Sequence, residues 1–404
     1  MITEQDGRLA RTVLLDEVAK LDIVTVEVDP ASTYRIAGVK IAGEGLLGRG
    51  EIRGGDTTYA KLHRLREGQV VYRKLTAWEG PITVVPQDFD GFYVSSEFPT
   101  ITLDTDQILP EYMELICRDP QFHGEMKALC TGTAERRNRL TPEHLLSISI
   151  SLPALEVQRS VSRHIARLDR LVSATEAMRV AAEELYQAAL DQQVDLLDDD
   201  PVSLSAVVQR IVSGRSPKCD ERRPIDGEWG VLKVSSVRRL QFDGREAKKL
   251  PDGEALFPNA EVQPGDLLTI RASGSRRLVG AFCIAEDPPA RRLMSDYHWR
   301  VELDPARADR RYVAHIMGAT AVRDELELAI VGSTTAAKLS KGRLLEVAIP
   351  LPASLVDQKR IARQLDALHS VVRTSQEQLV TLRAVHRSAL RQLLAEDATP
   401  LVAA

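Results

Sequence analysis

Residue sets that could catalyse a reaction are poorly represented in this sequence of 404 residues. The segment EDPPAR at 286–291 contains an Asp-Pro-Pro motif, which base-modifying enzymes complete with an aromatic ring that stacks on the base. Here Ala290 occupies the aromatic position, so a turn is the better interpretation. No Walker A sequence occurs, and Glu246 and Lys248 precede Pro251-Asp252 instead of following them as in a nuclease motif. We therefore expect no catalytic residues in this chain.

Metal-ligand and disulfide patterns are also missing from the sequence. The four cysteines, Cys117, Cys130, Cys219 and Cys283, lie far apart, and no pair has Cys-x-x-Cys spacing. The histidines are scattered and suggest no ligand set. We expect no metal site.

Basic and amide side chains suited to nucleic acid are more frequent. Arginine can pair bidentately with guanine and asparagine with adenine, and both also bind phosphates. The candidates in the first half are Arg49, Arg53, Arg73, Lys74, Arg136, Arg137, Asn138 and Arg139. Those in the second half are Arg215, Lys218, Arg222, Arg223, Arg271, Ser273, Ser275, Arg276, Arg277, Lys338 and Lys341. Any one of them is equally well explained as a solvated surface charge, but the clusters together favour DNA contact.

The net charge of -5 does not suggest a DNA-binding protein, but the local distribution of charge agrees with DNA contact. Residues 205–250 carry eleven Lys and Arg against six Asp and Glu. Residues 183–200 carry seven Asp and Glu and no Lys or Arg. The acidic excess is thus concentrated away from the candidate binding residues, where it would repel phosphates least.

Two long helices are predicted to position these residues. Residues 154–200 and 353–399 are runs of 47 residues each without glycine or proline. Apolar residues recur at spacings of three and four in both runs, which indicates a stripe suited to helix pairing. The stripe of the second run includes Ile361, Leu365, Leu368, Val372, Leu379 and Leu390. The first run has a weaker stripe of Val161, Ile165, Leu168, Val172 and Thr175, after which Met178, Ala182, Leu185 and Ala189 lie on a face that drifts away from it. We expect the two helices to pack antiparallel.

The segments before the helices form an internal repeat. SISISLPAL (147–155) matches EVAIPLPAS (346–354), and REGQVVYRK (66–74) matches QPGDLLTIR (263–271). Short apolar runs between Gly, Pro and Asp predict strands, and a helical pattern appears late in each half. We predict a mixed α/β fold with globular domains at 1–152 and 201–350, a central helix at 153–200 and a C-terminal helix at 351–399. Two such domains with pseudo-two-fold symmetry suit the reading of two DNA half-sites.

Almost the whole chain resembles the specificity subunits of type I restriction-modification systems. The first half does so through GVKIAGEGLLGRGEI (38–52), GQVVYRKLTAWEG (68–80) and DGFYVSSEFP (90–99), and the second through SGRSPK (213–218), GEWGVLKVSSV (227–237) and GDLLTIRASGS (265–275). The Pro-x-x-x-x-Gln sequence at 153–158 recurs, one residue longer, at 352–358. The resemblance implies two target-recognition domains that read a bipartite site in double-stranded DNA.

The resemblance also implies partners. Methyltransferase subunits would bring S-adenosylmethionine and methylate adenine N6, and restriction subunits with translocase activity would use ATP and Mg²⁺, while this chain would hold no cofactor itself. Leu171, Leu185 and Tyr186, which lie off the predicted helix stripes, are candidates for docking these subunits.

Two alternatives remain open. One is the recognition subunit of a type IIB-like restriction system, and the other is a coiled-coil scaffold with two protein-binding modules. A scaffold would show no salt-sensitive DNA affinity. The sequence contains no signal peptide or membrane-length apolar stretch, so we expect a cytoplasmic protein that does not contact a membrane.

Overall fold

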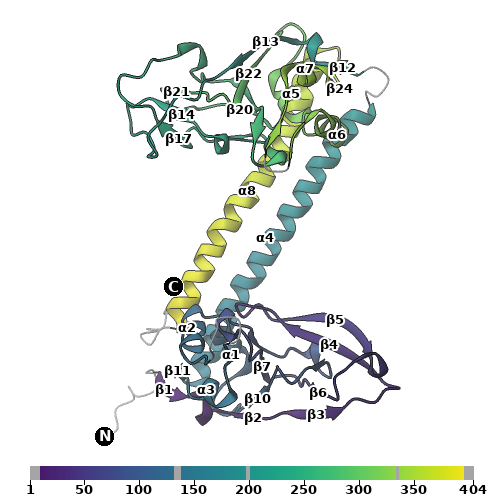
Figure 1. Ribbon diagram of the computed structural model, residues 1–404, viewed down its shortest axis with the longest axis vertical. Helices are drawn as coiled ribbons and strands as arrows, with labels where there is room; N and C mark the ends of the chain where they lie inside the picture. Colours follow the sequence, from purple (N-terminus) through teal and green to yellow (C-terminus); the bar gives the residue numbers. More distant parts are fainter. Residues whose placement is uncertain (1–9, 132–137, 197–200, 334–335, 395–404) are drawn as a thin grey trace. The chain divides into compact units, whose positions relative to one another are not determined.

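The computed structural model describes residues 10–131, 138–196, 201–333 and 336–394 and divides the chain into two compact units. Unit 1 comprises residues 1–175 and 378–404, and unit 2 comprises residues 176–377. The long helices α4 (Leu155–Leu196) and α8 (Leu355–Leu394) each contribute one part to each unit. Figure 1 shows strands and helices mixed within both units, so the predicted mixed α/β class and the two long helices are confirmed.

Each unit is built on a four-stranded sheet of the same order. The order is β2-β10-β7-β8 in unit 1 and β13-β22-β18-β20 in unit 2. The first set spans Ala19–Leu21, Thr100–Leu103, Val70–Tyr72 and Ile82–Val84. The second set spans Val208–Ser213, His298–Leu303, Asp266–Ile270 and Phe282–Ala285. All neighbouring strands in both sheets are antiparallel.

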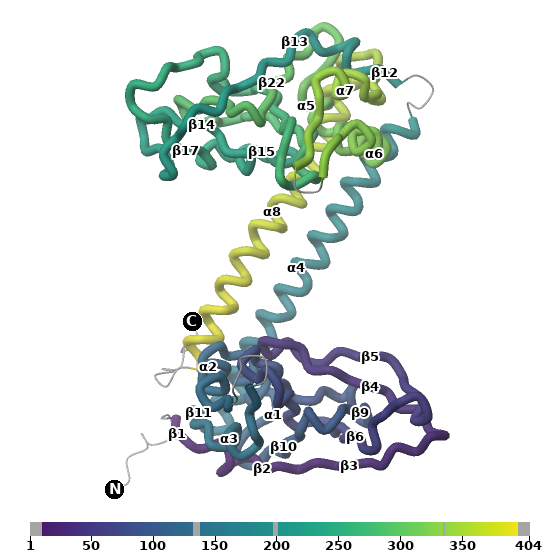
Figure 2. Tube along the Cα trace, in the orientation of Figure 1, coloured from purple at the N-terminus to yellow at the C-terminus, as the bar shows by residue number. Residues whose placement is uncertain are grey.

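Short helices follow the sheet in both units at matching places. In unit 1 they are α1 (Pro110–Cys117), α2 (Pro120–Ala128) and α3 (Pro142–Leu146), each with proline in its first turn, where the lost backbone donor costs nothing. In unit 2 they are α5 (Arg310–Ile316), α6 (Thr320–Ala329) and α7 (Lys341–Glu346). In Figure 2, α5 and α7 lie beside the first part of α8. The helical segments expected late in each half are therefore present.

The remaining strands differ between the units. Unit 1 adds a five-stranded sheet of order β3-β6-β9-β4-β5. Its strands span Val24–Glu27, Lys61–Arg64, Tyr93–Val94, Thr33–Val39 and Leu46–Arg53. Unit 2 instead has a β17-β14-β21 sheet and the pairs β15-β16 and β19-β23. These span Ala247–Lys249, Gly230–Leu232, Arg292–Leu293, Val237–Arg238, Gln241–Phe242, Ala272–Ser273 and Ala337–Lys338.

A two-stranded pair precedes the long helix in each unit. β1 (Arg11–Leu14) pairs with β11 (Ser149–Leu152), and β12 (Val202–Ser203) pairs with β24 (Ala348–Ile349). Both pairs are antiparallel, so the first strand of each unit closes against the last strand before the helix.

One buried glutamine fixes the start of each long helix. The Gln158 amide donates to the carbonyl oxygens of Gln107 and Pro153 and accepts from the backbone N–H of Leu109, at 2.8–2.9 Å. Gln358 makes the corresponding bonds to Arg307, Pro352 and Asp309, at 2.7–3.0 Å. Both side chains are 0% exposed. The repeated glutamine in the sequence is thus a structural clamp that satisfies otherwise orphaned backbone groups.

The predicted helix stripes are buried only in part. Val161 and Ile165 pack into the core of unit 1 together with Leu390, which shows that the two helix segments run antiparallel within that unit. Met178 and Leu185, which were predicted to lie on the drifting face of the first helix, are 46% and 58% exposed, so they add nothing to the buried stripe. Tyr186 and Leu190 are buried instead, in a core with α5 and the first part of α8. In unit 2, α4 packs against α5 as well as against α8, so a different face of the helix is buried from the one that the stripe predicted.

Candidate nucleic-acid interface

In unit 2, Arg271 lies immediately after β18 and is held on both sides by the backbone. Its N–H donates to the carbonyl of Tyr297 at 2.9 Å, and its carbonyl accepts from the N–H of Leu339 at 2.7 Å. The guanidinium carbon lies 5.7 Å from the centroid of the buried Trp299 ring. The Nε atom is buried without a hydrogen-bond partner among the described residues. Arg271 is therefore a cation on a fixed backbone, and no acceptor pairs with its guanidinium in the described part of the chain.

The loops around Arg271 contain further predicted residues. β19 pairs with β23, which places Ser273 opposite Ala337 and Ala272 opposite the exposed Lys338. Ser273 is buried, and its hydroxyl accepts from the N–H of Ser275 at 2.9 Å. The structure thus brings Lys338 next to Arg271, Ser273 and Ser275, which the sequence had placed in a separate segment.

Arg276 lies in the same region but is engaged internally. Its Nε pairs with Glu327 at 2.7 Å, and its Nη2 donates to the carbonyl oxygens of Glu327 and Ile330. Arg277 beside it is exposed. Of these two neighbours, Arg276 ties the loop to α6, whereas the guanidinium of Arg277 is accessible to a phosphate.

A second loop reaches the same end of unit 2. Gly214 is a close approach, because a Cβ there would lie 2.0 Å from the carbonyl oxygen of Met294. The following residue, Arg215, is exposed and donates its N–H to that carbonyl at 3.1 Å. Ser216 hydrogen-bonds the carboxylate of Asp296, next to the 44% exposed Tyr297. Arg215 is thus joined, through residues 294–297, to the surroundings of Arg271.

Unit 1 has an equivalent site at the end of β7. Lys74 donates its N–H to the carbonyl of Glu97 at 2.9 Å, and its carbonyl accepts from the N–H of Leu140 at 3.0 Å. This is the backbone pattern of Arg271, so Lys74 corresponds to Arg271 and Glu97 to Tyr297. Arg139, the counterpart of Lys338, pairs with Glu97 at 3.1 Å. Asn138 lies beside it, with its Oδ1 buried and without a partner among the described residues.

The other predicted DNA-contact residues lie elsewhere or are paired. Arg49 and Arg53 are exposed on β5, in the five-stranded sheet. Carboxylates hold Arg73, Arg222 and Arg223, which pair with Glu79, Glu228 and Glu246 respectively. The Lys341 ammonium donates to the carbonyl of Ile211 at 2.9 Å, and Lys218 is exposed near Arg215. Arg136 and Arg137 lie outside the described residues.

Sequence reasoning missed Glu97 and Tyr297, because the search favoured basic and amide side chains. Both residues lie in a turn of the same kind. The N–H of Phe98 donates to the carbonyl of Ser95, and the N–H of His298 donates to the carbonyl of Ser295, both at 3.0 Å. Their equivalence rests on strand register, since Thr100 opposes Val71 as Arg300 opposes Leu268. A comparison of the two halves by register could have found them.

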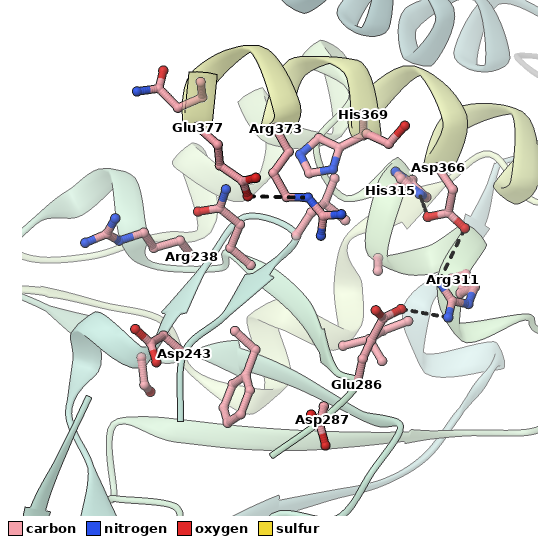
Figure 3. A pocket seen from close by; sticks show the side chains of 18 of the residues that line it. Arg238, Asp243, Glu286, Asp287, Arg311, His315, Asp366, His369, Arg373 and Glu377 are labelled. Atoms are coloured by element: carbon pink, nitrogen blue, oxygen red, sulfur yellow. Dashed lines mark hydrogen bonds and ion pairs between the residues drawn. The ribbon is translucent and has the colours of Figure 1, made fainter. Parts of the chain in front are cut away.

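A polar cleft of about 840 Å³ lies within unit 2, between α8, α5 and the strands β15, β16 and β20. Figure 3 shows Arg311 between Glu286 and Asp366, at 2.7 and 3.3 Å. The Nε2 of His315 lies 2.9 Å from Asp366, and its Nδ1 lies 2.9 Å from the hydroxyl of Tyr186. This acid–histidine–hydroxyl order resembles a nucleophile relay, but Tyr186 is 4% exposed. The chain of contacts joins α4, α5 and α8 and presents no nucleophile to a substrate.

The prediction that Tyr186 docks a partner subunit is therefore wrong, because its ring is buried against His315 and His369 within unit 2. Leu171 and Leu185 are 48% and 58% exposed and remain available to a partner. In the part of the chain that the structure describes, no group of three or more His, Cys, Asp or Glu side chains could hold a metal ion. Within the same residues, no helix is both long and apolar enough to cross a membrane.

Two curated proteins are similar to parts of this chain. The EcoEI type I restriction enzyme specificity subunit of Escherichia coli is 29% identical over 161 residues, 39% of this chain and 27% of that protein. The HindI type I specificity subunit of Haemophilus influenzae is 22% identical over 142 residues, 35% of this chain and 30% of that protein. The matched segments thus span less than a third of these relatives. No protein-family model matches the sequence.

The similarity of fold extends over nearly the whole chain. The S subunit of a type I restriction-modification system from M. genitalium superposes with a TM-score of 0.60 at 11% identity, covering 98% of this chain and 99% of that one. A chain from a type I system, solved in a study of complex assembly and conformational transition, gives 0.57 at 20% identity, covering 96% and 98%. The chain therefore has the fold of these solved type I chains over nearly its whole length, and parts of its sequence are similar to two type I specificity subunits.

Proposed function

We propose that this chain selects the DNA target of a type I restriction-modification complex, with each unit reading one half of a bipartite site. The observation that carries the proposal is that the same four-stranded framework ends in two equivalent sites with different polar side chains. Lys74, Glu97 and Arg139 surround the site in unit 1, and Arg271, Tyr297 and Lys338 surround it in unit 2. One framework with two different side-chain sets suits two readers of two different sequences.

The chemistry of the complex belongs to its partners in this proposal. Methyltransferase subunits supply S-adenosylmethionine and methylate adenine N6, and restriction subunits supply the ATP- and Mg²⁺-dependent translocation and cleavage. Leu171 and Leu185, which are exposed on α4, are the proposed docking residues for these subunits. The names of the two curated relatives, both type I specificity subunits, support a role in a type I system.

The direct test is to sequence modified bases across the host genome, with and without the gene for this chain. We expect methylated adenines in one motif of two specified halves separated by unspecified positions, and we expect this methylation to disappear on deletion. A continuous motif, or methylation that survives deletion, would contradict the proposal.

A second measurement separates DNA reading from a scaffold role. The complex reconstituted with its methyltransferase partner should bind target DNA with an affinity that falls steeply between 50 and 200 mM salt, by roughly 10³- to 10⁵-fold if it makes six to ten phosphate contacts. Affinity that is independent of salt would favour a protein-binding scaffold.

A further inference from the structure

We propose that Arg271 reads a guanine in the half-site recognised by unit 2. This inference rests on the proposed function and adds the base that one site selects. Arginine is suited to guanine because its planar guanidinium donates two parallel hydrogen bonds to the O6 and N7 acceptors in the major groove. The question is which arginine of unit 2 is both free and fixed in position.

Three of the six arginines in the predicted set of unit 2 are already paired within the protein. Arg222 and Arg223 pair with carboxylates, and Arg276 donates to one carboxylate and three backbone carbonyls. To bind a base edge, each would first have to give up an internal acceptor. A bound carboxylate also neutralises the charge that attracts DNA.

Arg271 differs because none of its guanidinium nitrogens has a hydrogen-bond acceptor among the residues that the structure describes. Among the described residues, no carboxylate pairs with it, and its Nε is buried and unsatisfied. A buried donor without a partner costs free energy in the isolated protein, about 1–3 kcal/mol, so its presence calls for an explanation. Binding to a base would satisfy the outer nitrogens and recover electrostatic energy in this half-buried setting.

Arg271 is also held in place before any ligand binds. Its guanidinium carbon lies 5.7 Å from the centroid of the Trp299 ring, which is 2% exposed, and hydrogen bonds fix the backbone N–H and carbonyl of Arg271 itself. A fixed side chain loses less conformational entropy on binding, which favours specific contacts over loose ones. Arg215 and Arg277 are exposed and lie on loops, so they suit phosphates, which need charge more than a fixed direction.

The experiment replaces the chromosomal copy in the host with Arg271→Lys or Arg271→Gln and sequences methylated bases genome-wide. Arg271→Lys keeps the aliphatic chain and the charge but lacks the paired donors, so it tests base reading with the least risk to folding. The matched control is Arg277→Gln, which removes an exposed arginine six residues away.

We expect both Arg271 variants to relax the motif at one guanine position in one half. Discrimination there should fall by roughly 5- to 150-fold, equivalent to about 1–3 kcal/mol. The other half should stay unchanged, and Arg277→Gln should lower methylation of all sites alike.

Three results would overturn the inference while leaving the proposed function intact. The first is an unchanged motif in both variants. The second is a loss of methylation at all sites alike in Arg271→Gln but not in Arg271→Lys, and the third is relaxation at a position that is not guanine. The uniform loss restored by lysine would identify a phosphate contact. A wild-type host without any bipartite motif that depends on this chain would instead overturn the proposed function, and the inference with it.

Discussion

The two units share their framework and differ at the surfaces built on it. The strand order of the four-stranded sheet is the same, and the buried glutamines Gln158 and Gln358 make the same three backbone contacts. Tyr112 and Tyr312 also match, donating their hydroxyls to the carbonyls of Ser151 and Pro350. By contrast, unit 1 carries a five-stranded sheet for which unit 2 has smaller sheets. The shared part anchors the long helices and carries the two equivalent candidate sites, which differ in their side chains, while the additional sheets differ in their strands.

The polar clusters on the long helices show how the same positions carry different chemistry. In unit 1, Asp169 on α4 contacts His386 on α8 at 2.9 Å and accepts two hydrogen bonds from Arg118 at 2.9 Å. The positions 200 residues away are His369 and Tyr186, whose rings lie 5.3 Å apart in unit 2. A contact between a carboxylate and a histidine in one unit thus corresponds to a contact between a tyrosine and a histidine in the other, so the units should respond differently to acid.

The largest expected effect tests the shared part. Replacing Gln358 with alanine removes three buried hydrogen bonds and leaves the backbone groups of Arg307, Pro352 and Asp309 without partners. We expect unit 2 to lose about 3–5 kcal/mol of stability, and Gln158→Ala should cost unit 1 a similar amount. Urea unfolding with amide hydrogen exchange in each unit measures both. Gln364→Ala, at an exposed position of α8, is the control and should change stability by less than about 0.5 kcal/mol. Unequal costs for the two glutamines would show that the clamps are not equivalent.

The next effect is a difference in pH dependence. Burial lowers the pKa of His298, which is fully buried between Ser236 and Ser295, to about 4. Its counterpart in unit 1 is Phe98, which does not titrate. Between pH 6.5 and 4 the unfolded chain binds a proton at His298 that the folded unit 2 does not bind. The stability of unit 2 therefore decreases as the pH is lowered from 6.5 to 4. The loss should reach about 3 kcal/mol.

Fluorescence of Trp229 and Trp299 in a Trp78→Phe background reports the unfolding of unit 2, since the chain has three tryptophans. His298→Gln should remove much of the pH slope. The remainder is expected from His369, whose pKa is also lowered to about 4, by burial and then by nearby cations. A slope that is identical in the variant would rule out His298 as its source.

A smaller effect concerns Asp169 in unit 1. Burial of its carboxylate raises the pKa, but hydrogen bonds and charge from Arg118, with His386, outweigh burial and lower it below the usual 3.8. The stabilisation is therefore full above about pH 4 and disappears as the pH falls through the lowered value. Because the side chain is 41% exposed, we expect Asp169→Asn to cost only about 1–2 kcal/mol at pH 7. If unit 1 lost stability between pH 6.5 and 5 through this residue, the assignment would be wrong.

The smallest effect on stability should come from Glu97, at the site equivalent to Tyr297. Its ion pair with Arg139 is partly exposed, so Glu97→Gln should change stability by less than about 1 kcal/mol. A carboxylate accepts from the amino group of cytosine in the major groove, and we therefore expect the variant to alter the motif only in the half read by unit 1. Modified-base sequencing checks this, and a change in the other half would break the equivalence of the two sites.

Much of the framework followed from the sequence alone. The long helices were predictable because glycine and proline act locally on backbone conformation, and both are missing from 154–200 and 353–399. The repeat was visible because shared backbone requirements, such as the glutamine that begins each helix, keep the same residue at the same place. The strand and helix order of the two units followed from short-range periodicity for the same reason.

The tertiary structure decided which residues are buried and which charges are free. Tyr186 was predicted to be exposed from helix periodicity, but its environment is set by His315 on α5 and His369 on α8, more than 100 residues away. Arg271 and Arg276 look alike in the sequence. Glu327 on α6 binds Arg276, whereas Trp299 on β22 supports Arg271 without offering an acceptor. Helix and strand patterns depend on neighbours in the chain, but burial and ion pairing depend on contacts that only folding brings together.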